Sequence, residues 1–305
     1  MKTPPNDDDL DRAATILRGG GLVAFPTETV YGLGANALNR DAVLRVYAAK
    51  GRPSTSPLIV HVSSFAMLDA VVETWPAAAQ QLVERFWPGP LTLVVKKHAG
   101  VPDEVTAGLN TIGVRMPAHP IAKELIRRAS VPVAAPSANR FTQISPTTAE
   151  HVRTSLGDSV DMILDGGPTT VGIESTVLSL TGHVPVLLRP GMVSQAAIEA
   201  IIGPITTGVS AQAHHPHASP GLHAKHYAPQ TPFYLLTPGE RLPPGRGKLL
   251  PMPARPEAYA ASLYAELHKA DLEGWDWIAV EEPPRSPDWD AIWDRLKRAA
   301  AAHLD

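Results

Sequence analysis

The chain has 305 residues with Lys+Arg 27 and Asp+Glu 30, so its formal net charge is −3 at pH 7. That balance argues against a protein that coats nucleic acid by bulk charge. Hydrophobic residues make up 44% and charged residues 19%, which excludes a disordered or coiled-coil chain and predicts one large globular domain or two. Cysteine is absent, which removes disulfides, thiolate nucleophiles and cysteine-based zinc sites.

The first residues, MKTPPNDDDL, are polar and acidic and unlike a signal peptide. No apolar run approaches the roughly 20 residues that a membrane span needs. Together with the lack of cysteine, these features predict a cytoplasmic protein with no membrane partner.

Apolar residues at helical spacing and capping residues predict a series of helices in the first part of the chain. The first carries apolar residues at Leu10, Ala14 and Leu17 and ends at three glycines, and Asn39 can cap the second. The predicted helices cover residues 8–18, 40–49, 65–73, 76–86, 119–129 and 147–156.

Short apolar runs alternate with these helices and predict strands. The last two runs are expected to form a hairpin around Gly182. The predicted strands cover residues 21–25, 57–62, 91–97, 111–117, 160–166, 175–180 and 184–188. Strands that alternate with helices, with a hairpin among them, indicate an α/β domain with a mixed sheet.

A stretch of different composition follows this domain. Residues 206–230 hold five histidines, one lysine and no acid, so a linker without regular structure is expected. Strand and helix patterns return at Phe233 and predict a small second α/β domain that docks on the first. The predicted division is therefore residues 1–205, a linker over 206–231, and residues 232–305.

A G-x-G-x-x-A motif at Gly32 to Ala37 follows the first predicted strand. A dinucleotide-binding fold would also need an acid about 20 residues further on, to hold the ribose. There is no Asp or Glu between Asp41 and Asp69, which argues against that fold. The glycines are expected instead to permit a tight turn close to a ligand.

Six polar segments with Pro or Gly lie at predicted strand ends, where ligands of α/β proteins bind. The segments cover residues 26–32, 50–53, 113–117, 136–139, 172–176 and 188–191. They supply four cations, which are Lys50, Arg52, Arg115 and Arg189, and many hydroxyls but few carboxylates. This chemistry suits a polyanion such as a triphosphate. The alternative is that the cations are solvated surface charges.

The chain resembles the YrdC/Sua5 family in motifs that follow one another in the family's order and cover nearly the whole chain. These are PTETVYGLG, the K-x-R of Lys50 and Arg52 followed by SPLIVHV, FWPGPLTLV, VRMP and the S-x-N of Ser137 and Asn139. The later segments GIESTVL, LLRPG and SPG-x-x-x-x-HYAP are similar to the longer, Sua5-type branch.

The resemblance implies a YrdC-like twisted mixed sheet with flanking helices, and a small C-terminal α/β domain of Rossmann-like, Sua5 type. It implies an L-threonylcarbamoyladenylate synthase, which makes threonylcarbamoyl-AMP and pyrophosphate from L-threonine, bicarbonate or CO2, and ATP with Mg²⁺. The product would pass to the tRNA threonylcarbamoyl-transferase machinery for the t6A modification. The chemistry needs a water-shielded carbamate and cations around the phosphates, but no protein nucleophile.

Carried over motif by motif, the resemblance implies two sets of site residues and a catalytic role for Lys50 and Arg52. The threonine-binding set is Thr29, His61, Arg115, Ala135 and Ser175. The ATP-binding set is Lys50, Arg52, Ser56, Thr111, Ser137, Asn139, Ser145, Arg189, His226 and Tyr227. No metal site made of protein ligands is expected.

Several roles stay open on the sequence. Glu28 could bind Mg²⁺, act as a base or pair with Lys50, and His61 could be a core histidine. The linker histidines form a poor metal cage without an element to fix them. The resemblance implies instead that the SPG…HYAP segment folds over the site as a lid, although residues 222–224 differ from the family's pattern.

Two other functions remain as alternatives. One is an RNA-binding module of YrdC type without catalysis, which the net charge disfavours. The other is a carbamoyl-transfer enzyme of the hydrogenase-maturation type, which would need further segments and is disfavoured by the absence of cysteine.

Overall fold

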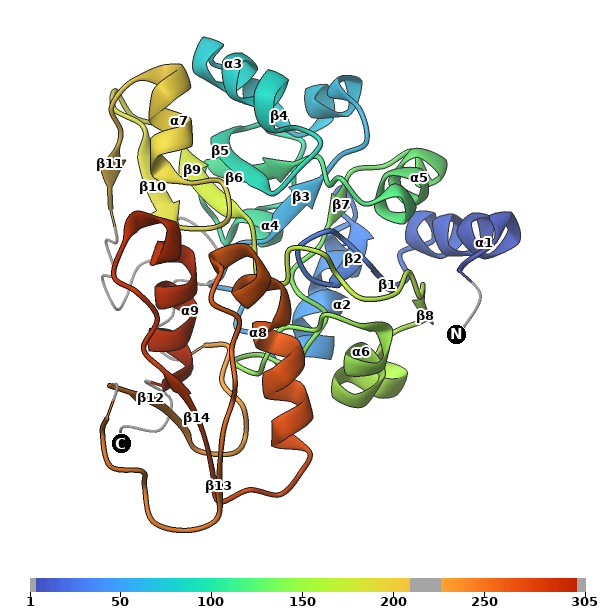
Figure 1. The fold of residues 1–305 in the computed structure, drawn as a ribbon. Helices are drawn as coiled ribbons and strands as arrows, with labels where there is room; N and C mark the ends of the chain where they lie inside the picture. Colours follow the sequence, from blue (N-terminus) through green and yellow to red (C-terminus); the bar gives the residue numbers. More distant parts are fainter. Residues whose placement is uncertain (1–3, 209–225, 238, 301–305) are drawn as a thin grey trace.

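The computed structural model describes residues 4–208, 226–237 and 239–300. They form a larger part that ends at β11 and a smaller part, coloured orange to red, that lies against it (Figure 1). None of the described helices is both long and apolar enough to cross a bilayer.

A mixed sheet runs through the larger part. Its order is β11 (Thr206–Thr207), β10 (Val186–Arg189), β9 (Thr176–Ser179), β5 (Leu91–Lys97), β6 (Thr111–Arg115), β3 (Ile59–His61), β7 (Val133–Ala134), β2 (Gly32–Asn36), β1 (Val23–Phe25) and β8 (Met162–Ile163). β3 is parallel to β6 and antiparallel to β7, so the ends of β3 and β6 that carry His61 and Arg115 lie side by side. The predicted mixed α/β architecture is confirmed.

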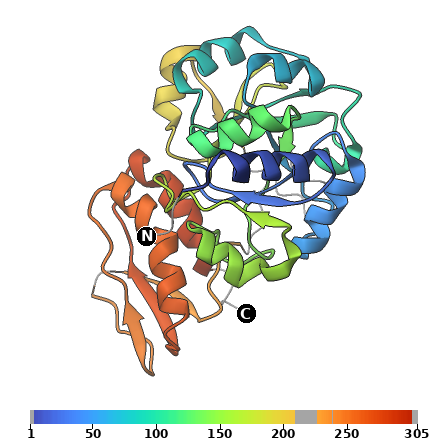
Figure 2. The ribbon, with the colours of Figure 1, turned by 90° about the vertical axis from the view of Figure 1, so that its right-hand side faces the viewer.

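Helices cover both faces of this sheet. α1 (Asp7–Arg18) and α5 (Pro120–Ala129) lie side by side on one face (Figure 2) and bury Val23 and Phe25 of β1. The intervening residues Leu22 and Ala24 point to the other face of the sheet and belong to the hydrophobic core there, because side chains of a strand alternate between its two faces. That core also includes α2 (Arg40–Lys50), α3 (Ala77–Phe86), α6 (Ala149–Leu156) and α7 (Gln195–Ile202).

The cap of α2 fixes the position of a site residue. The Asn39 side chain accepts hydrogen bonds from the backbone N–H groups of Asp41 and Ala42, as the sequence predicts. The helix ends at Gly51, in the left-handed region at φ 61°, where glycine carries no steric cost. Lys50 is therefore the last helical residue, and it is buried.

The glycine motif differs from its prediction. Residues Gly32–Asn36 are not a turn but strand β2, paired with β1 and β7. A Cβ on Gly34 would lie 2.7 Å from Cε1 of Phe25 and 2.9 Å from Cγ1 of Val133. The glycine therefore lets side chains of the neighbouring strands pack over β2.

Two further segments differ from the predicted elements. Residues 65–73 are not one helix: a 3-10 helix, η1 (Phe65–Ala70), precedes the short strand β4 (Val72–Thr74), which pairs with β5. Residues 206 and 207, predicted as the start of the linker, form β11 and extend the sheet beside β10. The remaining short elements are α4 (Asp103–Thr106), η2 (Gly157–Ser159) and η3 (Pro287–Trp289).

The smaller part is a parallel three-stranded sheet with two helices. Its order is β12 (Phe233–Leu236), β14 (Trp277–Glu281) and β13 (Gly247–Leu249), and its helices are α8 (Pro256–Asp271) and α9 (Asp290–Ala300). The parallel strands β13 and β14 are joined through α8, a β-α-β connection of the kind that the implied Rossmann-like domain contains.

The two parts share a hydrophobic core. Val30, Ile144 and Ile173 of the larger part belong to the same buried cluster as the side chains of α8 and α9. Gly172 makes the approach close, because it has φ +80° and a Cβ there would lie 2.3 Å from the carbonyl oxygen of Ala260. The smaller part is thus packed directly behind the loop that precedes β9.

Candidate active site

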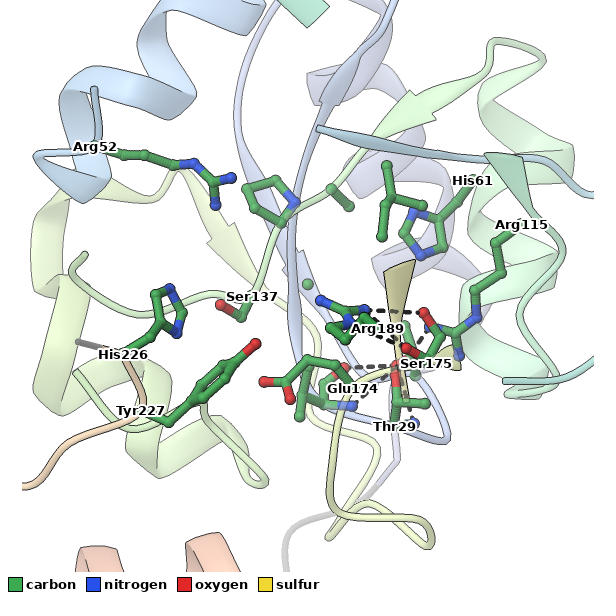
Figure 3. A pocket seen from close by; sticks show the side chains of 16 residues that line it. Thr29, Arg52, His61, Arg115, Ser137, Glu174, Ser175, Arg189, His226 and Tyr227 are labelled. Carbon is green, nitrogen blue, oxygen red and sulfur yellow. Dashed lines mark hydrogen bonds between the residues drawn. The ribbon is translucent and has the colours of Figure 1, made fainter. Parts of the chain in front are cut away.

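A pocket lies where the ends of β3 and β6 meet loops of the larger part and the segment that enters the smaller part (Figure 3). Its lining residues are Thr27, Thr29, Val30, Gly32, Arg52, Ile59, His61, Arg115, Ala135, Pro136, Ser137, Glu174, Ser175, Arg189, His226 and Tyr227. The predicted site residues among them are Thr29, Arg52, His61, Arg115, Ala135, Ser137, Ser175, Arg189, His226 and Tyr227.

Thr29 and Arg115 meet at one end of the pocket, on the right in Figure 3. Arg115 Nη1 donates to Oγ1 of Thr29 at 3.0 Å, and Nε donates to the carbonyl oxygen of Gly89 at 3.1 Å. Nη2 lies 2.6 Å from Oε1 of Glu28 in an ion pair of two buried side chains. A guanidinium has five N–H groups, so one N–H on each terminal nitrogen remains for a bound carboxylate.

The contacts of Glu28 bear on its open role. Its second oxygen accepts the backbone N–H of Ala118 at 3.0 Å. Its ionic partner is Arg115, whereas the Lys50 ammonium donates to backbone carbonyls elsewhere, so the pairing of Glu28 with Lys50 was the wrong alternative. Glu28 acts here as a support that orients the arginine.

His61 lies on the same side of the pocket, at the end of β3 and beside Arg115. It is buried, and its Nδ1 has no hydrogen-bond partner among the described residues. Burial, and then the Arg115 charge, lower its pKa to about 3. The imidazole is therefore neutral at physiological pH and can serve as a hydrogen-bonding wall but not as a cation.

Ser175 and Arg189 hold the floor of the pocket together. Arg189 donates from Nε and Nη2 to the carbonyl oxygen of Ser175, at 3.1 and 2.9 Å. The Ser175 hydroxyl is 2.8 Å from Oγ1 of Thr92 on β5. These contacts join β9, β10 and β5 at the point where the pocket opens, so the Arg189 charge is fixed there by buried groups.

Arg52 stands at the opposite end of the pocket, on the left in Figure 3. Nη2 donates to the carbonyl oxygen of Pro57 at 3.1 Å, and Nε is buried with no hydrogen-bond partner among the described residues. Burial lowers its pKa to about 10, which leaves the guanidinium charged. A buried charged donor without a partner is costly in an empty protein and is typical of a site built for an anion.

Lys50 is buried, but it does not line the pocket. Its ammonium donates to the carbonyl oxygens of Ser137 and Asn139, and burial followed by the nearby Arg52 charge lowers its pKa well below the usual value. Lys50 therefore shapes the loop that presents Ser137 to the pocket.

Four more predicted ATP-binding residues stand behind or away from the pocket surface. Asn139 donates to the carbonyl oxygens of Arg140 and Gln143, and the Ser145 hydroxyl donates to Glu174. Ser56 is buried in the loop after α2. Thr111 begins β6, four residues before Arg115, which is about 13 Å along a strand.

His226 and Tyr227 cover the pocket from the segment that leads into the smaller part. The Ala228 N–H donates to the carbonyl of Thr142 in the larger part, and the His226 N–H donates to the carbonyl of Arg298 on α9. Tyr227 has φ 65° and is almost fully buried, with its hydroxyl toward the pocket centre (Figure 3). With this cover in place the cavity volume is about 50 Å³.

The rest of the predicted linker and lid lies outside the described residues. This includes His214, His215, His217 and His223 and the divergent stretch at 222–224. Among the residues that the structure does describe, no group of three or more His, Cys, Asp or Glu could hold a metal ion.

Two protein-family models match successive stretches of the sequence. Residues 15–191 match the Sua5/YciO/YrdC family model, which is described as telomere recombination. Residues 193–301 match a model described as the C-terminal domain of threonylcarbamoyl-AMP synthase. The chain belongs to the Sua5/YciO/YrdC family.

Individual family members resemble the chain over its whole length. It is 43% identical to a threonylcarbamoyl-AMP synthase of Bacillus subtilis over 98% of this chain and 95% of the relative. A crystal structure of Pyrococcus abyssi Sua5 complexed with L-threonine has 37% sequence identity and a TM-score of 0.91, and the match covers 99% of this chain and 96% of that one. Escherichia coli YciO, at 26% identity and a TM-score of 0.54, matches over 62% of this chain.

Sequence reasoning missed Glu174, which lines the pocket, and the two groups behind it. Glu174 stands in the GIEST motif, and its acidic character was the available signal. Tyr264 and Arg295 donate to it from α8 and α9 of the smaller part. Nothing in the local sequence around those two residues marks them as part of a site.

Proposed function

We propose that this family member is an L-threonylcarbamoyladenylate synthase: an enzyme that converts ATP, L-threonine and CO2 into threonylcarbamoyl-AMP and pyrophosphate, with water as a further product when bicarbonate is the carbon source. The observation that carries the proposal is that one pocket has a polar end at Thr29 and Arg115 and a buried cation, Arg52, at its other end. The name of the full-length Bacillus relative and the threonine-bound Pyrococcus structure support it.

L-threonine fits the end of the pocket with Arg115. The two remaining guanidinium N–H groups can bind the amino-acid carboxylate in a fork. The Thr29 and Ser175 hydroxyls are near enough to this end to bind the polar groups of the substrate, and the neutral His61 closes the wall. The amine of threonine would then point toward the middle of the pocket.

ATP fits the other end, where Nε of Arg52 is buried without a hydrogen-bond partner among the described residues and Ser137 and Arg189 face the same space. In the proposed reaction the threonine amine attacks CO2 to give a carbamate, and a proton leaves the nitrogen. A carbamate oxygen attacks the α-phosphorus, and the bond to pyrophosphate breaks. The cations stabilise the charge on the phosphates, and no protein nucleophile takes part.

His226 and Tyr227 give the pocket the cover that this chemistry needs. A carbamate decomposes readily in water, so the intermediate must be shielded until it is adenylylated. Burial, followed by the Glu174 carboxylate, raises the pKa of Tyr227, so its phenol is neutral and can donate a hydrogen bond. The segment must open to admit ATP and close for the reaction.

Mg²⁺ is proposed to enter with ATP. Glu174 is the one carboxylate among the described residues of the pocket wall, and its oxygens already accept from Ser145, Tyr264 and Arg295. The protein side chains therefore do not form a magnesium cage, and the phosphates would supply most of the ligands.

The remaining partners belong to the same proposal. Bicarbonate or CO2 is the carbon source, and the product passes to the tRNA threonylcarbamoyl-transferase machinery for the t6A modification. The protein itself is proposed to act in the cytoplasm without stable binding to nucleic acid.

Pyrophosphate release tests the proposal. The full chain should release pyrophosphate only when ATP, L-threonine and bicarbonate are all present, and mass spectrometry should detect threonylcarbamoyl-AMP in equal amount. Thr29→Val should lower kcat/KM for threonine, whereas Thr15→Val on the exposed side of α1 should leave it unchanged. Pyrophosphate release that does not depend on threonine would refute the proposal.

A further inference from the structure

Glu174 is a carboxylate in the wall of the pocket, and the smaller part of the molecule binds it from behind. Its Oε1 accepts from the Ser145 hydroxyl at 2.6 Å. Its Oε2 accepts from Nε of Arg295 at 2.9 Å and from the Tyr264 hydroxyl at 3.1 Å. Two of its three side-chain donors thus come from α8 and α9, about 90 and 120 residues further along the chain.

Arg295 reaches both segments that carry the floor of the pocket. Besides Oε2 of Glu174, it binds the backbone carbonyl of that residue through Nη2 at 3.2 Å and the carbonyl of Pro190 through Nη1 at 2.8 Å. Glu174 and Pro190 directly neighbour Ser175 and Arg189, which are themselves bonded to each other. Arg295 is fully buried, with an exposed fraction of 0%.

The charge of Glu174 creates a conflict that these contacts resolve. Burial raises the pKa of Glu174, but Arg295 and Arg189 outweigh burial and the pKa is lowered, so the carboxylate is ionised. An ionised carboxylate in the wall would repel the phosphates of ATP. Arg295 supplies the compensating charge from the side that faces away from the pocket.

We propose that Arg295 and Tyr264 are positioning residues for ATP: they hold and neutralise Glu174, so that the smaller part completes the phosphate end of the pocket. This inference rests on the function proposed above. It assigns to the smaller part a task in substrate binding, in addition to packing against the larger one.

A purely structural role is a poorer account of these contacts. A buried arginine and its carboxylate cost much desolvation, and apolar side chains of similar size often pack at least as stably. Here the buried charged groups surround one carboxylate that lines the pocket, Glu174. Around it stand Arg189 and Lys50 of the larger part, Tyr227 of the covering segment, and Tyr264 and Arg295 of the smaller part. Arg295 also pairs with Asp294 at 2.8 Å, and Asp294 in turn pairs with Arg298.

The test measures ATP binding by calorimetry with the full chain and MgCl2, without threonine, so that it does not depend on turnover. Arg295→Met should weaken ATP binding by about tenfold or more, the size expected when one partner of a buried charge pair is removed. Adding Glu174→Gln to Arg295→Met should restore most of the affinity, because the pocket wall then holds no carboxylate and Asp294 keeps its pair with Arg298. The control is Arg285→Met, an exposed arginine that pairs with Glu282 outside the pocket.

Lowering the pH separates charge from structural damage. In Arg295→Met the unpaired carboxylate takes up a proton more easily, so ATP affinity should improve between pH 8 and 6, and the wild type should not show this gain. If Arg295→Met does not fold, Tyr264→Phe is used to test the proposal instead. It removes a single hydroxyl, and it should weaken ATP binding in the wild-type background but not in a Glu174→Gln background.

The outcomes distinguish the two proposals. Unchanged ATP affinity in Arg295→Met, or in Tyr264→Phe if that variant replaces it, overturns the inference, and so does a loss that neither Glu174→Gln nor low pH relieves. A wild-type chain that binds ATP with the expected variant pattern, but makes no threonylcarbamoyl-AMP, supports the inference and refutes only the proposed function. A wild-type chain that does not bind ATP overturns the inference, and if it also releases no pyrophosphate with all three substrates it overturns both.

Discussion

Acidification should destabilise the protein through His61, because the folded structure buries this side chain as a neutral group. Its pKa is lowered from 6.5 to about 3, mainly by burial and then by the charge of Arg115. In the unfolded chain the imidazole is hydrated and takes up a proton near pH 6.5. Below that pH the unfolded state binds a proton that the folded state does not, so the free energy of unfolding falls as the pH drops.

The size of this effect follows from the two pKa values. Above pH 6.5 the free energy of unfolding does not depend on the protonation of His61. Between pH 6.5 and about 3 the free energy of unfolding falls steadily, because the unfolded state alone binds the proton. Protonation of His61 makes the ratio of unfolded to folded protein about 30 times larger at pH 5 than at pH 8. This factor corresponds to a loss of about 2 kcal/mol in the free energy of unfolding. That is a substantial share of the stability of a typical domain.

Urea unfolding of the wild type and of His61→Gln, at pH 8 and pH 5, measures the effect. The loss of stability between the two pH values should be smaller in the variant by about 2 kcal/mol. Other histidines with a lowered pKa, such as the partly buried His151 at about 4, act equally in both proteins and cancel in the comparison. His98→Gln, which replaces an exposed imidazole far from the pocket lining, is the matched control variant.

Equal losses in the wild type and in His61→Gln would show that the folded protein holds His61 in a hydrated or charged state. The neutral wall assigned to it in the pocket would then be wrong. A larger loss in the variant would contradict the sign of the argument as well as its size.

Three further predictions concern the site and its support. Arg52→Ala should lower kcat/KM in the pyrophosphate assay by about 100-fold or more, the usual loss when a charged donor at a reacting group is removed. The control variant Arg285→Ala should keep kcat/KM within about twofold of the wild type. Equal effects of the two substitutions would refute the assignment of Arg52 as a phosphate-binding cation. Lys50→Met should lower the free energy of unfolding by about 2 kcal/mol in urea, because two buried carbonyls lose their donor, and an unchanged midpoint would refute its structural role. Gly172→Ala should destabilise by about 2 kcal/mol or more, because of its positive φ and its contact with Ala260, and a thermal midpoint equal to that of the wild type would contradict the close approach.

Much of the architecture could be predicted from local patterns in the sequence. Asn39 caps its helix as expected, and the hairpin around Gly182 pairs β9 with β10. These features depend on residues near one another in the chain, whose spacing sets the secondary structure directly. The prediction failed at Gly32 to Ala37, because a glycine-rich run is extended only where neighbouring strands need the space above it.

The candidate site was predictable as a collection of residue types, because polar side chains beside Pro and Gly followed the predicted strand ends. Their individual contacts were not. The partner of Glu28 is Arg115 and not Lys50. These two residues are far apart in the chain and meet only because the loop after β1 packs against the end of β6. Lys50 belongs to a motif that suggests a substrate contact, yet its ammonium is used by two backbone carbonyls.

The sequence by itself determined the order of the elements, the family and the chemical character of the pocket, because each depends on residue types at short spacing. Only the tertiary structure decided which charges are neutralised and from where. Glu174 and Arg295 are 121 residues apart and belong to different parts of the molecule. No local pattern marks such a pair, since its interaction exists only once the two parts have packed together and removed both charges from water.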